Sequence, residues 1–156
     1  MSDPPVDPRG PRFAAWVTTA VLVAVLVSGS ALLLGAQAVV FALGAFAGLR
    51  FSPYGVLYRA AVAPRLGPPT EREDASPVRF AQGVGFAFAV VGTAGYALGA
   101  PVIGIVATAM ALGAAILNAA FGICLGCEVY LRLPARWRPQ PSTVKARNNP
   151  QRGATA

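Results

Sequence analysis

Cys124 and Cys127 are the residues best suited to carry chemistry, because they are the two cysteines of the chain and lie three positions apart in FGICLGCEVYLRLP. Two thiols at this spacing can exchange with a disulfide or hold a soft metal ion. Glu128 follows the pair directly, and Arg132 lies one helical turn beyond it. We expect these two charged side chains to pair with each other and to modulate the thiols.

Histidine is absent from the sequence, which excludes a histidine base, a Ser/His/Asp arrangement and a His-ligated metal within one copy of the chain. A structural zinc site needs four protein ligands, so zinc would require a second copy or a partner. Two-coordinate Cu(I) would need only Cys124 and Cys127. No cofactor is expected, since the glycine-containing stretch at Gly83 follows no strand. Buried thiols acting as small apolar side chains remain the alternative.

The surrounding chain is too apolar for a soluble domain of 156 residues, because 55% of its residues are hydrophobic and only 12% are charged. Charged residues are missing between Arg12 and Arg50 and again between Arg79 and Glu128. Each gap is too long for one membrane crossing and long enough for two, since a crossing takes roughly 20 helical residues. We therefore expect an all-α integral membrane bundle of four transmembrane helices in two hairpins.

The expected organisation is a transmembrane domain over residues 12–133, between a disordered N-terminal tail (1–11) and a basic disordered C-terminal tail (134–156). The N-terminal tail lacks the apolar core of a signal peptide. The four spans are expected at about residues 13–34, 36–50, 77–98 and 101–123. Residues 53–63 are expected either to form an interfacial helix or to extend the second span.

Turn and capping residues refine these boundaries. Gly35 and Gly99 predict the hairpin turns. New helices are predicted to start at Ser52–Pro53, at Ser76–Pro77 and at Pro101, because serine is a good N-cap and proline is favoured in the first helical position.

The fourth helix can continue from Pro101 to about Leu133, which would place the two cysteines toward its C-terminal end. The partial negative charge of that end, together with the carboxylate of Glu128, would raise the pKa of a thiol. Cys127 is expected to react first because it would lie nearer water, and Cys124 is expected to resolve the product.

Small residues at helix interfaces allow close backbone contact within lipid. Three GxxxG spacings offer such contacts: Gly44 with Gly48, Gly95 with Gly99, and Gly122 with Gly126. Whether the chain also forms a homo-oligomer stays open.

Four spans would place both tails and the middle loop on one side of the membrane, and every Lys and Arg of the chain lies in those segments. The positive-inside rule makes this side cytoplasmic, where thiols are kept reduced. The lipid bilayer is therefore an expected partner. Nucleic acid is not, because the positive charge follows the membrane topology.

Four stretches resemble one family: DPRGPRF, SPYGVLYRAAVAPRLGPP, EREDASPVRFAQGVG and LNAAFGICLGCEVYLR. Over about residues 7–133 the chain resembles the bacterial membrane proteins grouped as domain-of-unknown-function family 4395. The resemblance implies a four-helix protein of the bacterial cytoplasmic (plasma) membrane, whose members often carry the CLGCE ending. It also implies gene neighbours of thioredoxin-like and rhodanese-like sulfurtransferase types, and so a soluble partner of one of these kinds. It assigns no reaction.

Three hypotheses result from these observations. The first is thiol–disulfide or sulfur-transfer chemistry through Cys124 and Cys127 at the cytoplasmic side, with Glu128 and Arg132 as modulators. The second is a non-catalytic membrane scaffold that binds a partner through its middle loop and basic tail. The third is Cu(I) binding by the two thiols.

Overall fold

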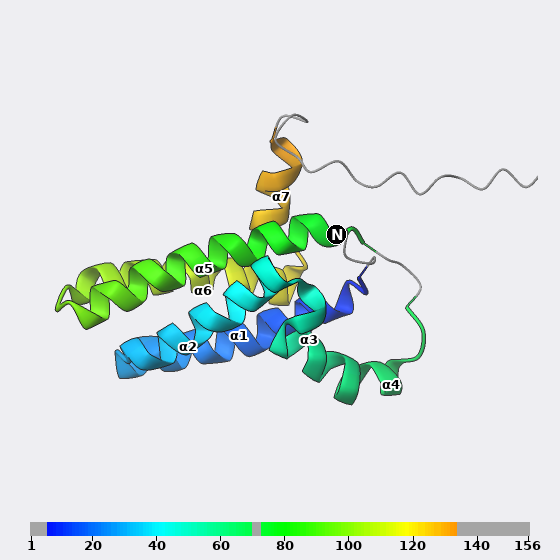
Figure 1. Cartoon of the computed structure of the whole chain (residues 1–156), viewed down its shortest axis with the longest axis horizontal. Coiled ribbons are helices and arrows are strands. Elements are labelled where there is room, and N and C mark those ends of the chain that lie inside the picture. Colours follow the sequence, from blue (N-terminus) through cyan, green and yellow to red (C-terminus); the bar gives the residue numbers. More distant parts are fainter. Residues whose placement is uncertain (1–5, 70–72, 134–156) are drawn as a thin grey trace, which may run out of the picture.

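The computed structural model describes residues 6–69 and 73–133. The secondary structure of these residues is helical, which confirms the all-α class. An isolated antiparallel bridge joins Val6, near the start of the chain, to Glu73. Four long helices make up what we call the helical body: α1 (Arg9–Ser28), α2 (Ala31–Ala42), α5 (Ala75–Ala97) and α6 (Pro101–Phe121). Within it α5 packs between α2 and α6, and α1 also packs on α6 (Figure 1).

The first hairpin turns at Gly29 and Ser30, so the predicted turn at Gly35 is wrong. Gly29 adopts the left-handed conformation (φ 62°), and its N–H donates to the carbonyl of Val25. The hydroxyl of Ser30 then accepts from the N–H of Leu33 and caps α2. This pair of caps stops one helix and starts the next, whereas Gly35 lies inside α2.

The end of α2 continues as a π-helical turn, Leu43–Ala47, and the chain reverses at Gly48 (φ 105°). The guanidinium of Arg79 in α5 donates to the carbonyls of Ala45 and Phe46 at 2.8–3.4 Å. These carbonyls lie in the π-helical turn at the end of the helix, and Arg79 satisfies them. The second predicted span therefore ends before Gly48.

A separate helical segment comes next, made of α3 (Pro53–Leu57), a π-helical turn (Tyr58–Val62) and α4 (Ala63–Leu66). Its start agrees with the prediction, with Ser52 as N-cap and Pro53 in the first position. Because Gly48 and a 3₁₀ turn (Leu49–Phe51) separate it from α2, the alternative of an extended second span is wrong.

The second hairpin begins two residues earlier than predicted. Asp74 is the N-cap of α5, and its carboxylate accepts from the N–H of Ser76 at 2.9 Å. Pro101 is the first residue of α6, as predicted. The fourth helix does not run unbroken to Leu133, because α6 ends at Phe121 and a new helix, α7 (Leu125–Arg132), begins after it.

Part of the predicted N-terminal tail is structured. Val6 exchanges both backbone hydrogen bonds with Glu73 at 2.9 Å, and α1 already begins at Arg9, so the prediction of disorder is wrong for these residues. Residues 1–5 and the predicted basic tail, 134–156, lie outside the described residues.

Three helices are long and apolar enough to cross a membrane: Arg9–Ser28, Ala75–Ala97 and Pro101–Phe121. The apolar helix Ala31–Ala47 is shorter. Large apolar side chains on the outside of the helical body are widely exposed, for example Val27 (85%) and Leu32 (86%). Such a surface is costly in water and suits a bilayer, which indicates a membrane protein.

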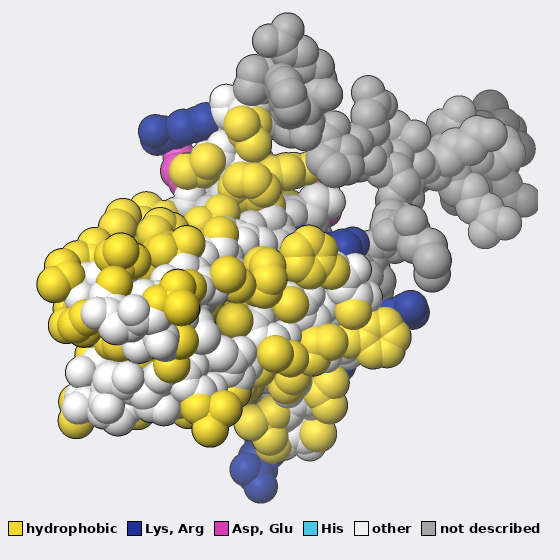
Figure 2. Space-filling view, turned by 60° about the vertical axis from the view of Figure 1, so that its left-hand side comes forward, with side chains coloured by type: hydrophobic (Ala, Val, Ile, Leu, Met, Phe, Trp, Pro, Cys, Tyr) yellow, Lys and Arg dark blue, Asp and Glu magenta, His cyan; other side chains and the backbone are white. Residues whose placement is uncertain are grey.

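The two ends of the helical body differ in charge. Figure 2 turns the end with the two hairpin turns toward the viewer, and the side chains there are hydrophobic or uncharged. The charged residues Asp7, Arg9 and Asp74 lie instead where α1 and α5 begin, and Glu128 and Arg132 lie on α7, which follows the end of α6. Figure 1 shows these helix ends at one end of the helical body. We call this second end the charged end, and it holds both the cysteine pair and a second polar cluster.

The three GxxxG spacings do not act as paired packing motifs. In each pair one glycine faces another helix closely: Gly44 faces Gln82, Gly95 faces Gly104, and Gly126 faces Ala81. The other glycine of each pair has a positive φ and lies at a turn or helix end. Close packing is therefore achieved by single glycines.

Candidate functional site: the Cys124–Cys127 turn and its surroundings

The turn between α6 and α7 places Cys124 outside both helices. Gly122 ends α6 in the left-handed conformation (φ 71°), and its N–H donates to the carbonyl of Asn118 at 3.0 Å. Cys124 is then extended (φ −88°, ψ 101°) and is the N-cap of α7. Glycine is favoured at position 122, because residues with a side chain rarely adopt a positive φ.

The Cys124 sulfur takes the role that a serine oxygen has in an ordinary N-cap. The backbone N–H of Cys127 donates to Cys124 Sγ, with N and S 3.4 Å apart. The side chains of the two cysteines also interact strongly enough to shift the pKa of each other. Both side chains are partly exposed. The two sulfurs are therefore close together, and both are partly accessible from outside the protein.

The two thiols are strongly differentiated in acidity. The hydrogen bond from the Cys127 thiol, helped by the peptide N–H groups of Cys127 and Gly126, outweighs burial and lowers the pKa of Cys124 to about 7. The same hydrogen bond, followed by burial and by the negative charge on Cys124, raises the pKa of Cys127. Cys124 is thus the thiol that ionises near neutral pH.

This geometry overturns the predicted position of the cysteines in the helix and bears on the predicted order of their reaction. The cysteines lie at the start of a helix and not at the end of one, so the peptide groups of α7 favour a thiolate. The pKa of Cys124 is lowered and the pKa of Cys127 is raised, so the thiolate form is favoured on Cys124. The prediction that Cys127 reacts first is therefore not supported.

Helix α7 is held by close packing against α5. A Cβ built on Gly126 would lie only 2.6 Å from the Cα and Cβ of Ala81. The rings of Phe80 and Tyr130 also meet, with centroids 5.6 Å apart. Figure 1 shows α7 standing out from the helical body where it crosses α5. The start of α7 is thus anchored on a long helix, which holds Cys124 in its cap position.

Glu128 and Arg132 pair with each other as predicted, at 3.1 Å between carboxylate oxygen and guanidinium nitrogen. The pair is largely exposed, so it contributes only about 0.3–0.5 kcal/mol. The carboxylate that acts on the cysteines is Glu73, whose negative charge raises the pKa of both thiols. Glu73 comes from the strand-like contact with Val6, far away in the sequence, and no spacing pattern points to it.

Within residues 6–69 and 73–133, no group of three or more His, Cys, Asp or Glu side chains gathers in a way that could hold a metal ion. A closed zinc site needs four ligands. The chemistry that two neighbouring thiols can perform without further ligands is exchange with a disulfide, sulfur transfer, or linear coordination of Cu(I).

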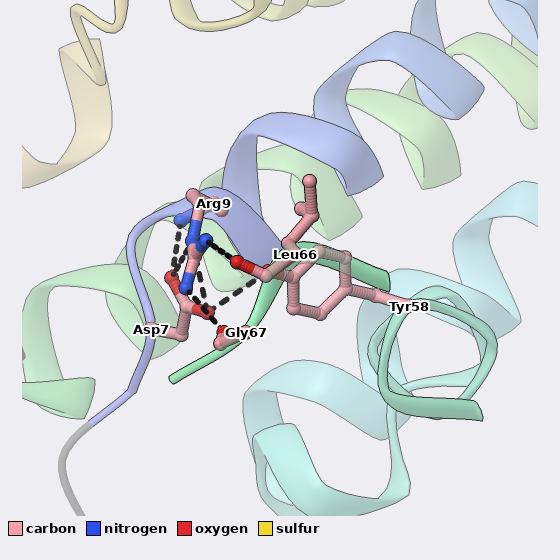
Figure 3. A network of polar contacts seen from close by, with 5 residues as sticks. All are labelled: Asp7, Arg9, Tyr58, Leu66 and Gly67. Carbon is pink, nitrogen blue, oxygen red and sulfur yellow. Dashed lines mark hydrogen bonds and ion pairs between the residues drawn. The ribbon is translucent and has the colours of Figure 1, made fainter. Parts of the chain in front are cut away.

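A second polar cluster lies at the charged end, and sequence analysis missed it. The carboxylate of Asp7 accepts from the guanidinium of Arg9 at 3.1 Å and from the hydroxyl of Tyr58 at 2.8 Å (Figure 3). Arg9 also donates to the carbonyls of Leu66 and Gly67, where α4 ends. We call these five residues the Asp7 network. It ties the start of α1 to both ends of the segment Tyr58–Leu66.

Burial alone would raise the pKa of Asp7, but the hydrogen bonds from Arg9 and Tyr58 together lower it. Desolvation and the bond to Asp7 raise the pKa of the Tyr58 hydroxyl. Both shifts favour an ionised carboxylate bound to a neutral phenol across the neutral pH range.

A protein-family model described as "Domain of unknown function (DUF4395)" matches residues 6–134, which include both the cysteine turn and the Asp7 network. The chain belongs to this family. No curated protein and no solved structure matches the chain. Family membership fits the apolar helices of the fold and assigns no reaction to the cysteines.

Proposed function

We propose that this member of the DUF4395 family is a multi-pass protein of the bacterial cytoplasmic membrane that exchanges thiols and disulfides with a soluble partner. Cys124 and Cys127 carry the exchange. The observation that supports this most is the position of Cys124 at the N-cap of α7, where Cys127 donates to its sulfur. A thiol with a pKa near the ambient pH is the best compromise between ionisation and nucleophilicity.

The proposed topology has four crossings with the charged end in the cytoplasm. Ala31–Ala47 is taken as the fourth crossing, because a helix of about 17 residues is at the lower limit for a span. α1 and α5 begin at the charged end and α6 finishes there, which supports a topology with both termini and the middle loop on one side. The arginines of that side favour the cytoplasm under the positive-inside rule.

The exchange proceeds in two steps. The Cys124 thiolate attacks one sulfur of a partner disulfide, forms a mixed disulfide, and releases the other partner sulfur as a thiolate. Cys127 then loses its proton and attacks Cys124 Sγ, which breaks the mixed disulfide and releases the second partner thiolate. Two electrons pass to the partner, and the chain is left with a Cys124–Cys127 disulfide. The second attack is local, because the backbone N–H of Cys127 already contacts Cys124 Sγ, with N and S 3.4 Å apart.

Sulfur transfer would use the same nucleophile. The Cys124 thiolate would attack the outer sulfur of a partner persulfide, take up that sulfur as its own persulfide, and release the partner as a thiolate. No electrons are gained or lost in this step. The proposal favours a thioredoxin-like or rhodanese-like partner, since both kinds present a reactive sulfur at their surface.

Exposed apolar side chains lie near Cys124 in the chain and would offer a surface for that partner. Ile123 is 51% exposed, Leu125 43% and Val129 53%. They flank the sulfur on both sides in the chain. Apolar contact around an otherwise accessible sulfur would hold a partner segment in place during the exchange.

Trapping of the mixed disulfide tests the proposal. A Cys127→Ser variant lacks the second thiol, so a partner captured by Cys124 should remain attached and be identified after non-reducing purification from cells. Cys124→Ser should capture little, and the double variant should capture nothing; both serve as matched controls.

Two outcomes would contradict the proposal. Capture that depends on Cys127 alone would reverse the assigned order of attack. If the double variant replaces the wild-type protein in cells without any measurable change, the thiols are not used, which would favour the scaffold hypothesis.

A further inference from the structure

A cavity of about 210 Å³ lies at the charged end, between α1, the segment Leu49–Arg59 and α5. Its walls are mostly apolar and include Pro11, Ala14, Leu49 and Val78. Tyr58, whose hydroxyl belongs to the Asp7 network, forms one side (Figure 3). The cavity is therefore held open by residues that are themselves tied together by hydrogen bonds.

Two arginines also line the cavity, Arg50 and Arg59, and both residues are exposed. Arg59 donates one hydrogen bond to the carbonyl of Arg50 at 2.6 Å, and the Arg50 guanidinium lies 4.6 Å from the centre of the Phe51 ring. Each guanidinium has five N–H donors in a planar fork that matches a phosphate. These contacts hold both arginines at the cavity while leaving further donors for a ligand.

The negative charge in the lining does not cancel this attraction. Asp7 also lines the cavity, but its carboxylate is engaged by Arg9 and Tyr58. The lining thus combines one carboxylate, whose charge is balanced by Arg9, with the two cationic groups of Arg50 and Arg59. An anionic group is favoured near Arg50 and Arg59, and an apolar group is favoured against Ala14 and Val78.

The volume of the cavity further limits the kind of ligand that it can hold. Drug-sized molecules bind in pockets of roughly 300–1,000 Å³, so a cavity of about 210 Å³ holds only part of a larger molecule. Phe51 in the 3₁₀ turn and Val56 and Leu57 in α3 are each exposed by about half, as side chains at a bilayer surface are. A molecule that reaches this place from the bilayer is an amphiphile whose remaining chain stays in lipid.

We propose that the cavity binds one anionic phospholipid, with its phosphate at Arg50 and Arg59 and the upper part of an acyl chain against Ala14 and Val78. The proposal depends on the membrane location of the helical body and not on the chemistry of the cysteines. Anionic lipids are abundant in the cytoplasmic leaflet, which is the side proposed for the charged end.

The test uses the full-length protein, purified in a non-ionic detergent and titrated with dioleoylphosphatidylglycerol or dioleoylphosphatidylcholine, with bound lipid counted by native mass spectrometry. We expect one phosphatidylglycerol to bind in preference to phosphatidylcholine. An R50Q/R59Q double variant should bind phosphatidylglycerol roughly 30-fold more weakly, since each of the two arginines near a lipid surface contributes about 1 kcal/mol. R65Q is the matched control, because Arg65 lies on α4 outside the cavity and should leave the affinity unchanged.

A cavity-filling variant keeps the test independent of charge and of any folding defect in the arginine variant. Ala14→Leu leaves both arginines in place and fills the apolar part of the cavity, so it should also weaken binding of phosphatidylglycerol. The C124S/C127S variant should bind as the wild-type protein does, which separates this proposal from the thiol proposal.

Three results would overturn the proposal. Equal binding of the two lipids would show that the site does not select the net negative charge of the headgroup. An equal loss in R65Q would show a diffuse surface attraction. Displacement of the lipid by an equal concentration of inorganic phosphate would show a site for free phosphate and not for a lipid.

Discussion

The cysteine turn and the Asp7 network lie at the same end of the molecule but are assembled in different ways. The cysteine turn is built from residues 122–127, and its main hydrogen bond joins residues three positions apart. The Asp7 network joins Asp7 and Arg9 to Tyr58, Leu66 and Gly67, which lie more than 45 positions along the chain. A local motif can create chemical reactivity, whereas the long-range network fixes where elements lie.

The cysteine turn and the Asp7 network also differ in how much they contribute to stability. The cysteine turn is open to solvent and carries a reactive group, so it contributes little to stability by itself and depends on the packing of α7 against α5. The Asp7 network consists of charge-assisted hydrogen bonds, which contribute more than neutral ones. We therefore expect damage to the network to change stability, and changes near the cysteines to change reactivity unless they displace α7.

The largest effect is expected where the local site depends on a distant helix. Gly126→Leu would place side-chain atoms where Ala81 already lies, since even a Cβ at this position comes within 2.6 Å of its backbone. Overpacking of this kind should cost about 3 kcal/mol in free energy of unfolding. It should also return the pKa of Cys124 toward the ordinary value of a thiol, because α7 must move off α5. Denaturation in detergent and the rate of Cys124 alkylation measure the two effects.

Gly83→Ala is the matched control for this prediction. Gly83 lies inside α5, and an added Cβ there would meet nothing within 4 Å. The variant should be neutral or slightly more stable than the wild-type protein, since alanine is the better helix former. A similar loss in both variants would contradict the view that the contact between Gly126 and Ala81 anchors α7.

A smaller effect is expected in the Asp7 network. Asp7→Asn removes the charge that holds Arg9 and Tyr58, and we expect a loss of about 2 kcal/mol in free energy of unfolding. Because the pKa of Asp7 is lowered in the folded protein, its contribution is fully present above pH 4 or so and is lost as the pH falls through the folded pKa. The stability of Asp7→Asn should therefore depend less on pH in that acidic range than the stability of the wild-type protein does.

Denaturation curves at neutral pH and in the acidic range check this prediction. The rate of Cys124 alkylation at neutral pH should stay close to that of the wild-type protein, because the network touches neither sulfur. A loss of thiol reactivity equal to that in Gly126→Leu would mean that the cysteine turn and the Asp7 network are not separable.

The smallest effect concerns the acidity of the thiols alone. Glu73→Gln removes a negative charge that raises the pKa of both cysteines, so the pKa of Cys124 should fall. Glu128→Gln is the matched control: its carboxylate is engaged by Arg132 at an exposed position, and the pKa of Cys124 should change less. The pH dependence of alkylation in the two variants distinguishes them, and the opposite ranking would restore Glu128 as the modulator.

Much of the fold could be predicted because charge and proline are strong local signals. The two uncharged gaps locate the helical body, and Pro53 and Pro101 mark helix starts correctly. The turn at Gly29 carries a sequence signal that the prediction missed, since Gly29 lies between Ser28 and Ser30, whereas Gly35 lies between Leu34 and Ala36. The number of membrane crossings remains a prediction.

The candidate site could be located from the sequence, but the sequence did not show at which end of a helix the cysteines lie. The spacing of Cys124 and Cys127 identifies the thiols, yet FGICLGC is compatible with a continuous helix by composition. The helix breaks because Gly122 takes a positive φ and Cys124 caps α7, and this break reverses the expected acidity of the thiols. Glu73 and the Asp7 network depend on contacts between distant segments, for which a single sequence carries no periodic signal.

The pH dependence of cysteine alkylation in the wild-type protein tests the central claim most directly. Membranes would be treated briefly with iodoacetamide between about pH 5 and 10, a range that brackets the ordinary pKa of a thiol, and the modification of each cysteine would be quantified separately by peptide mass spectrometry. The N-cap geometry predicts that Cys124 reacts first, with a midpoint near pH 7, and that Cys127 becomes reactive only at much higher pH. A midpoint for Cys124 near the ordinary thiol value, or faster modification of Cys127, would contradict the assignment of Cys124 as the nucleophile.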